Sequence, residues 1–226
     1  MKKKNTKTIL VALGTLVAFA LWTFLIRCVD VQPIGPNGSR VGFAAINGAF
    51  HALTGVHWAL YTLTDWLGLV PIGIALGFAV LGLVQLIRRK SLLKVDRDIL
   101  ILGGFYIVVL AAYLLFETVV INFRPVLIDG KLEASYPSST TMLALCILPT
   151  AMMQLKTRIR GDAVRRAILG ILAAFTVFMV VGRLISGVHW LTDIIGGVLL
   201  SVGLVMLYAF AAKRQGKSRK NSLACV

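Results

Sequence analysis

Six long apolar runs constrain this chain more than any other feature. They cover residues 8–26, 68–87, 99–121, 138–155, 167–185 and 190–212. Each run is close to the roughly 20 residues that an α-helix needs to cross a bilayer. Hydrophobic residues make up 58% of the 226 and charged residues only 15%. Because a backbone in lipid must satisfy its own hydrogen bonds, such runs form helices. The sequence therefore predicts an all-α fold, a six-span transmembrane helical bundle.

The first run is expected to be a retained span rather than a secretory signal. Its apolar core is too long for a signal, and no small-residue cleavage site follows it. Val41–Leu67 is apolar and aromatic, and we expect it to lie at the membrane interface. The predicted organisation is a first span with an outer, interfacial segment (1–67), a five-span core (68–212) and a basic cytoplasmic tail (213–226).

The net charge of +15 is distributed as a topology signal. Basic residues cluster before the first run and after the second, fourth and sixth runs, at residues 2–7, 88–97, 156–166 and 213–220. In a six-span chain these positions share one side, and positive residues favour the cytoplasm. The pattern predicts a multi-pass protein of the cytoplasmic (plasma) membrane with both termini inside. It favours membrane lipids as partners and argues against nucleic acid.

The stretch Val181–Asp193 holds the most unusual polar residues, between the last two apolar runs. Arg183, His189 and Asp193 lie there around a Ser-Gly break. On a helix the spacing of four would place Asp193 within hydrogen-bonding reach of His189 and orient its imidazole. An arginine suits a phosphoryl group. The alternative is that the histidine and aspartate only cap the following helix.

Two other segments contribute candidate residues on the same predicted face. The third span is expected to end at Arg124, with Glu117 about two turns deeper in the membrane. Ser138 and Ser139 open the fourth span, and a helix N-terminus favours bound anions. Together with Arg183 they predict a phosphate pocket at the extracytoplasmic end of the bundle.

These residues resemble the integral-membrane type 2 phosphatidic acid phosphatases, which are related to the vanadium haloperoxidases. The family motifs read Lys-x6-Arg-Pro, Pro-Ser-Gly-His and Ser-Arg-x5-His-x3-Asp. Here the third is Gly182-Arg183, five residues, His189, three residues and Asp193. The first survives as Arg124-Pro125 and the second as Pro137-Ser138.

The resemblance implies a lipid phosphatase or diphosphatase that works through a phosphohistidine. His189 would attack phosphorus, with Asp193 orienting it and Arg183 stabilising the transition state. Arg124, Arg183, Ser138 and Ser139 would bind the phosphoryl oxygens. The family needs no metal or other cofactor. The expected partner is a lipid phosphate or diphosphate.

Two positions depart from the family pattern. Glu117 stands where the family has a lysine, and Thr140 replaces the histidine that protonates the leaving group. Losing a general acid costs about 10²–10⁴ in rate, and a diphosphate needs that proton less than a lipid alkoxide does. We therefore expect a preference for a substrate such as a polyprenyl diphosphate. A second hypothesis is that Glu117, if buried and protonated, replaces the missing acid.

Other interpretations stay open. The chain would be a catalytically impaired pseudo-enzyme if it only bound lipid phosphate headgroups or a membrane partner. A haloperoxidase is disfavoured, because Thr140 replaces the histidine that such enzymes need. A transporter has little support beyond the spans and Glu117. His57, in a Gly-Val-His-Trp echo of residues 187–190, is a reserve candidate for the site.

Overall fold

The computed structural model describes residues 2–223, and the side chains of residues 6–213. The helices are α1 (Lys2–Cys28), α2 (Ala44–Thr54), α3 (Trp58–Leu67), α4 (Leu69–Arg89), α5 (Arg97–Thr118), α6 (Ser139–Arg158), α7 (Asp162–Ile185) and α8 (Leu191–Leu223). Two short 3₁₀ turns, Pro36–Gly38 and Leu92–Lys94, lie in loops. Within residues 2–223 the only β-type pairing is three isolated bridges. The all-α prediction is confirmed.

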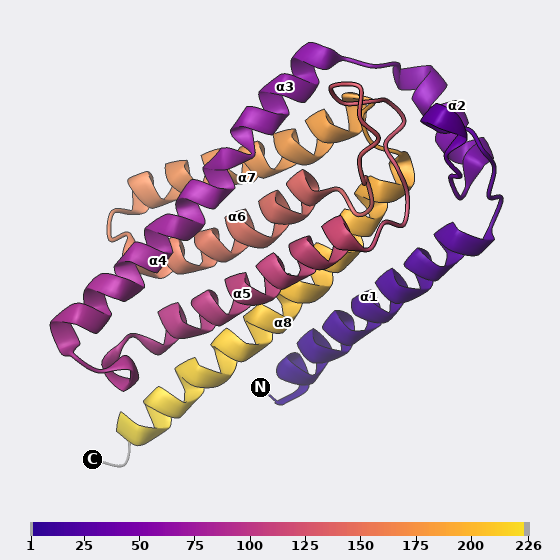
Figure 1. The fold of residues 1–226 in the computed structure, drawn as a ribbon. Coiled ribbons are helices and arrows are strands. Elements are labelled where there is room, and N and C mark those ends of the chain that lie inside the picture. Colours follow the sequence, from indigo (N-terminus) through magenta and orange to yellow (C-terminus); the bar gives the residue numbers. More distant parts are fainter. Residues whose placement is uncertain (1, 224–226) are drawn as a thin grey trace.

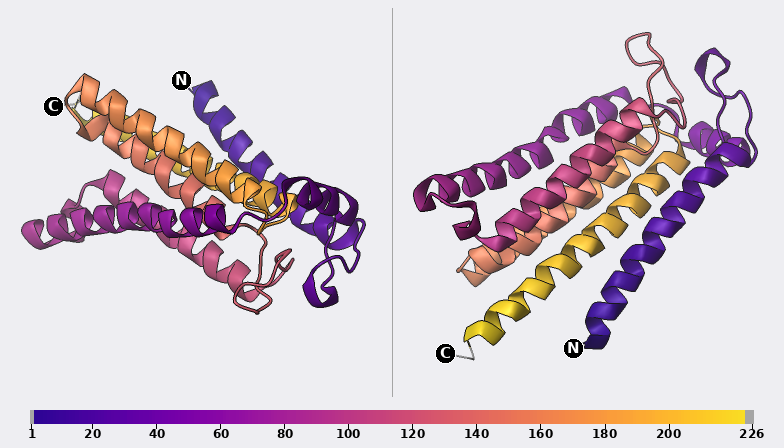
Figure 2. Two further views of the ribbon diagram at one scale, coloured as in Figure 1. Left: turned by 90° about the horizontal axis from the view of Figure 1, so that it is seen from above. Right: turned by 60° about the horizontal axis from the view of Figure 1, so that its bottom comes forward.

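The long helices run side by side as an elongated bundle (Figures 1 and 2). Five stretches within the described residues are long and apolar enough to cross a membrane: Thr6–Cys28, Trp58–Arg89, Arg97–Thr118, Asp162–Ile185 and Leu191–Lys213. The protein is therefore a multi-pass helical membrane protein. α6 is the remaining predicted span, and it carries polar residues at both ends. A total of six spans stays a prediction.

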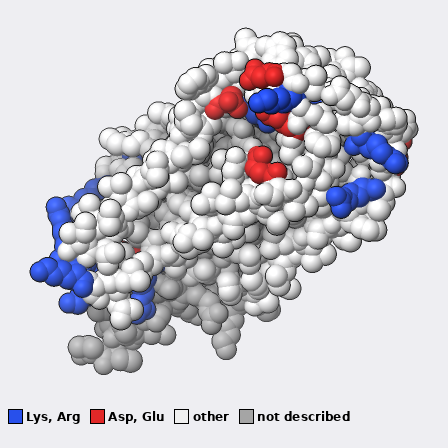
Figure 3. Space-filling view, in the orientation of Figure 1, with Lys and Arg blue, Asp and Glu red and all other residues white. Residues whose placement is uncertain are grey.

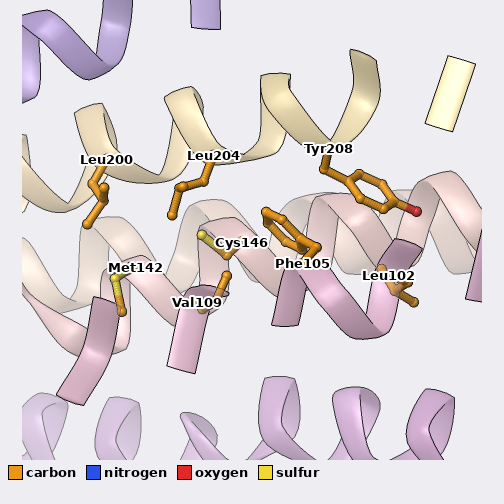
Figure 4. Packing of buried hydrophobic residues seen from close by; sticks show 8 residues of the cluster. All are labelled: Leu102, Phe105, Val109, Met142, Cys146, Leu200, Leu204 and Tyr208. Carbon is orange, nitrogen blue, oxygen red and sulfur yellow. The ribbon is translucent and has the colours of Figure 1, made fainter. Parts of the chain in front are cut away.

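α6 forms the centre of the bundle, in contact with α4, α5, α7 and α8. One apolar cluster joins α6 to α5 and α8 through residues such as Met142, Phe105 and Leu204 (Figure 4). A second cluster joins Ala144 and Leu148 of α6 to Met179 of α7. α1 packs along α8. This packing holds the N-termini of α6 and α8 near each other at one end of the bundle.

Two helix boundaries differ from those predicted. α3 runs into α4 almost without interruption, because Gly68 between them keeps helical backbone angles. Residues 58–67 therefore belong to a continuous 32-residue apolar stretch and contact α7, while their place relative to the membrane interface stays a prediction. α5 ends at Thr118, so Arg124 lies in a loop instead of at a helix end. Glu117 is thus in the last turn of α5, and the predicted depth of two turns was wrong.

The two ends of the bundle differ in charge. Both ends of the described chain lie at the same end of the bundle as the α4–α5 and α6–α7 connections (Figure 1). In the view of Figure 3 one group of Lys and Arg lies at that end, and most of the visible Asp and Glu lie at the opposite end together with further Lys and Arg. α8 continues through the predicted tail to Leu223, and residues 224–226 of that tail lie outside the described residues.

Candidate functional site

His189 lies in the short turn between α7 and α8, and only 2% of it is exposed. Arg124 Nη1 donates to His189 Nε2 at 3.2 Å, and the Ser135 carbonyl lies 3.1 Å from His189 Nδ1. A guanidinium only donates and a carbonyl only accepts. The contacts therefore define a neutral imidazole with its proton on Nδ1 and an unprotonated Nε2, which is the form a nucleophile requires.

The surroundings of His189 favour its neutral form. Burial, and then the positive charges of Arg124 and Arg183, hold the pKa of His189 well below its usual value. The hydrogen bond to Ser135 acts in the opposite direction and is weaker. A charged imidazolium at this position would face two guanidinium groups in an apolar setting. The lowered pKa thus favours the neutral imidazole that the hydrogen bonds define.

Asp193 is fully buried, but its relation to His189 differs from the prediction. Asp193 Oδ2 is 3.8 Å from His189 Nδ1, beyond hydrogen-bonding distance, because His189 precedes α8 and does not share a helix face with Asp193. The Asp193 carboxylate instead accepts the Trp190 N–H at 2.9 Å. That bond reaches back from the first turn to the residue before the helix, as in a capping box. The expected direct hydrogen bond is absent among the described residues, and Asp193 caps the start of α8.

Arg124 reaches the site from the loop between α5 and α6. The two arms of this loop pair through Arg124 N–H with the Glu133 carbonyl at 3.0 Å and Ser135 N–H with the Asn122 carbonyl at 2.9 Å. The Arg124 side chain also forms an ion pair with Glu133, Nε to Oε2 at 3.1 Å. Backbone pairing and the ion pair together aim the guanidinium at His189, as its predicted role requires.

Arg183 is buried at the end of α7, and α3 holds it. Its guanidinium donates to Thr64 Oγ1 and Asp65 Oδ1, each at 3.4 Å, and lies over the Tyr61 ring with its carbon 4.8 Å from the centroid. It makes no described hydrogen bond to His189. Its charge nevertheless lowers the pKa of His189, so it contributes to the positive potential there.

The predicted anion site at the start of α6 lies against the start of α8. Ser138 precedes α6, and its N–H donates to the Asp193 carbonyl at 3.2 Å. The Ser138 hydroxyl is buried and has no hydrogen-bond partner among the described residues. Ser139 and His189 line one cavity of about 10 Å³, close to the size of one water molecule. The α6 N-terminus, whose dipole favours anions, therefore lies beside the imidazole.

The two departures from the family motifs lie on different surfaces. Glu117 lines the same small cavity as His189, so it does face the site. Its side chain is exposed rather than buried among the described residues. Thr140 lines a separate apolar groove between α4 and α5, with its methyl group close to Gly68.

His57 does not bring its ring to His189. Its exposed ring contacts the Thr54 carbonyl at 2.9 Å, while its backbone N–H donates to the Ser186 carbonyl at 3.0 Å. The two Gly-Val-His-Trp segments nevertheless lie against each other. Gly187 has φ +71°, and a Cβ there would lie 1.9 Å from the Gly55 carbonyl oxygen, so this close approach requires glycine. Among the residues whose side chains are described, no group of three or more His, Cys, Asp or Glu could hold a metal.

Three residues of the site escaped the sequence reasoning. Ser135 contributes a backbone carbonyl, for which the side-chain sequence carries no signal. Asn122 Nδ2 donates to Asp193 Oδ1 at 3.4 Å, but nothing in the sequence around it distinguishes it from an ordinary asparagine in a loop. Asn47 is fully buried and bonds to Thr192. An asparagine within an apolar segment was the signal that could have identified Asn47.

Fold and site together define a multi-pass helical membrane protein with a buried, arginine-flanked histidine at one end of its bundle. The chain is similar to the crystal structure of a transmembrane PAP2-type phosphatidylglycerolphosphate phosphatase from Bacillus subtilis. The TM-score is 0.52 at 21% identity, over 91% of this chain and 96% of that one. At this identity the match supports the fold.

The sequence of the second half carries the family signal. Residues 112–217 match the PAP2 superfamily model. The resemblance predicted from the motifs is confirmed, and the matching region contains Arg124, Ser138 and His189. A comparison with curated proteins returned no match.

Proposed function

We propose that this protein is a membrane lipid phosphatase or diphosphatase that works through a phosphohistidine. The observation that carries the proposal is the unprotonated Nε2 of buried His189, which faces the Arg124 guanidinium at 3.2 Å beside the α6 N-terminus. A nucleophile, a cation and a helix N-terminus meet at one point. Mere binding of an anion would not require a histidine in this tautomer.

In the proposed reaction, Nε2 of His189 forms a bond to phosphorus as the bond to the leaving oxygen breaks. Arg124 then binds phosphoryl oxygens instead of Nε2, while Arg183 adds positive potential and the first amides of α6 receive developing charge. The imidazolium of the phosphohistidine keeps its Nδ1 proton on the Ser135 carbonyl. Water next attacks phosphorus, which releases phosphate and returns the neutral imidazole.

A groove between α4 and α5 supports a lipid substrate. It has a volume of about 950 Å³ and a mainly apolar lining that runs from Leu86 and Leu92 to Asp65, Ser139 and Thr140. Tyr113 and Ser139 line both this groove and the cavity that contains His189. A hydrocarbon chain in the groove would therefore place its phosphate group near His189.

The missing general acid favours a diphosphate. Thr140 has no titratable proton near neutral pH and lies in the groove, so it does not replace the family histidine. Phosphate leaving from a diphosphate needs little protonation, whereas a lipid alkoxide needs it strongly. We therefore propose a polyprenyl diphosphate or a similar lipid diphosphate as the preferred substrate class.

Glu117 is the candidate substitute acid, since it lines the cavity with His189. If it donates the proton, Glu117→Gln lowers kcat on a monoester by about 10²-fold or more, and much less on a diphosphate. Full monoester activity in this variant would exclude the role.

Phosphate release by the detergent-purified protein tests the proposal. We expect release from a polyprenyl diphosphate to exceed release from phosphatidic acid without added metal, and both to disappear in His189→Ala. Tight lipid binding with no release in the wild type would instead identify a pseudo-enzyme. Better cleavage of the monoester would overturn the substrate preference.

Charge supports an orientation for the site. The basic residues in the last turns of α4 (Arg88, Arg89) and α6 (Lys156, Arg158) lie at the opposite end of the bundle from the turn between α7 and α8 that carries His189 (Figure 1), and such clusters favour the cytoplasm. We therefore propose a protein of the cytoplasmic membrane with both termini inside and the site facing outward.

A further inference from the structure

The turn that carries His189 is held by residues from outside the region that matches the PAP2 model. Thr192 lies in the first turn of α8, three residues after His189. Asn47 Oδ1 accepts the Thr192 N–H at 3.2 Å, and Asn47 Nδ2 donates to Thr192 Oγ1 at 2.9 Å. Trp22 Nε1 donates to the Thr192 carbonyl at 3.1 Å. The first turn of α8 is thus fixed by side chains of α1 and α2.

The other end of the turn is held by the end of α2 and the residues that follow it. The His51 ring contacts the Gly187 carbonyl at 3.1 Å, and the His57 N–H donates to the Ser186 carbonyl at 3.0 Å. Because these carbonyls only accept, His51 Nε2 is the donor. His189 therefore lies between two anchored points, one at residues 186–187 and one at Thr192.

Asn47 is the residue of this network whose side chain makes the most hydrogen bonds. It is fully buried, and its amide also donates to the Gly42 carbonyl at 2.8 Å. Every polar atom of its side chain is therefore used. A buried amide that loses such partners is costly, so this network has one favoured arrangement.

We propose that Asn47 is a positioning residue for His189, and that Asn47, His51 and the His57 backbone support the site although they lie outside the region that matches the PAP2 model. The inference rests on the proposed function. Nucleophilic attack requires Nε2 within about 3–3.5 Å of phosphorus and in line with the leaving group. The network sets this geometry by fixing Thr192, which follows the turn that carries His189.

Kinetics of four variants test the proposal. Asn47→Leu keeps the size and removes all three hydrogen bonds; we expect kcat to fall about 10–10²-fold with KM changed less than twofold. In Thr192→Val, kcat should fall less, because the hydrogen bond from the Thr192 N–H to Asn47 remains. Thr192→Ser keeps the hydroxyl and should restore wild-type kcat. Leu53→Ala, on the same helix and 83% exposed, is the matched control and keeps wild-type activity.

The Thr192 pair separates positioning from a general structural role, because Thr192→Ser keeps the hydroxyl that accepts from Asn47 Nδ2 and Thr192→Val removes it. Wild-type kcat in Asn47→Leu would overturn the proposal, as would failure of Thr192→Ser to restore activity.

Amide hydrogen exchange provides a readout that does not depend on activity. In detergent-purified Asn47→Leu, peptides covering residues 186–195 should exchange faster while those covering 97–118 stay unchanged. Unchanged exchange at 186–195 would overturn the proposal. If the wild type releases no more phosphate than His189→Ala, the proposed function fails, and the exchange experiment still decides the role of Asn47.

Discussion

The hydrogen bonds of His189 decide what its neighbours do. The Ser135 carbonyl fixes the Nδ1 proton, so Asp193, at 3.8 Å, is not required for the tautomer. We predict that Asp193→Asn lowers kcat only about tenfold, because the charge near the imidazolium is lost while the tautomer and the helix cap remain. Steady-state kinetics and thermal unfolding check this. A loss of about 10⁴, typical where the carboxylate itself sets the tautomer, would contradict it.

The lowered pKa of His189 predicts an unusual pH profile. Neutral His189 is the active form, and activity is lost as pH falls through its pKa in the folded protein. Since burial, Arg124 and Arg183 hold that pKa well below its usual value, the acid limb of kcat/KM should lie well below pH 6.5. Arg124→Gln should move the limb toward higher pH. An acid limb of the wild type at or above pH 6.5 would contradict a lowered pKa of His189.

The Arg124–Glu133 ion pair should contribute less to catalysis than the Arg124 guanidinium itself. Glu133 is about two-fifths exposed, and ion pairs of this kind contribute at most about 1 kcal/mol. Glu133→Gln should therefore lower kcat/KM by about fivefold or less, whereas Arg124→Gln lowers it far more. Equal losses in the two variants would show that Glu133 acts on the reaction itself.

Among the helices, α4 and α5 bear on substrate choice. Gly104 of α5 lines the groove, and a Cβ there meets no atom within 4 Å, so a side chain can be added at this position without a contact at its Cβ. We predict that Gly104→Phe lowers kcat/KM for a long-chain lipid diphosphate at least tenfold and leaves a short-chain analogue nearly unaffected. Gly77→Phe is the control, because Gly77 has the same free space outside the groove lining. Equal effects on both chain lengths would exclude a chain in the groove.

The sequence predicted the helices better than their ends. Apolar periodicity and length identified the bundle, since lipid leaves few alternatives to helices. The end of α5 and the continuity of α3 with α4 could not be predicted from the sequence, because apolar residues continue on both sides of each boundary. Motif spacing found His189, Arg124 and Ser138. The Ser135 carbonyl and the Asn47 network depend on segments far apart in the chain, which a single sequence does not place together.

For the whole molecule, the charged ends predict an orientation in the cell membrane. Cys28 is exposed and follows the first span toward the end that carries the site, and Cys146 is buried. In intact cells, a membrane-impermeant maleimide should label the wild type but not Cys28→Ser. Lys94→Cys in a background that also carries Cys28→Ser and Cys225→Ser should react only after the membrane is permeabilised. The reverse pattern would place the site in the cytoplasm.

The central claim is that Nε2 of His189 becomes bonded to phosphorus, and rapid quenching tests it most directly. With a lipid diphosphate that carries ³²P at the terminal phosphate, the wild type should form an acid-labile, alkali-stable phosphoprotein before phosphate is released. The label should map to His189 and be absent from His189→Ala. Release of labelled phosphate without any labelled protein, at times short enough to resolve one turnover, would contradict the account.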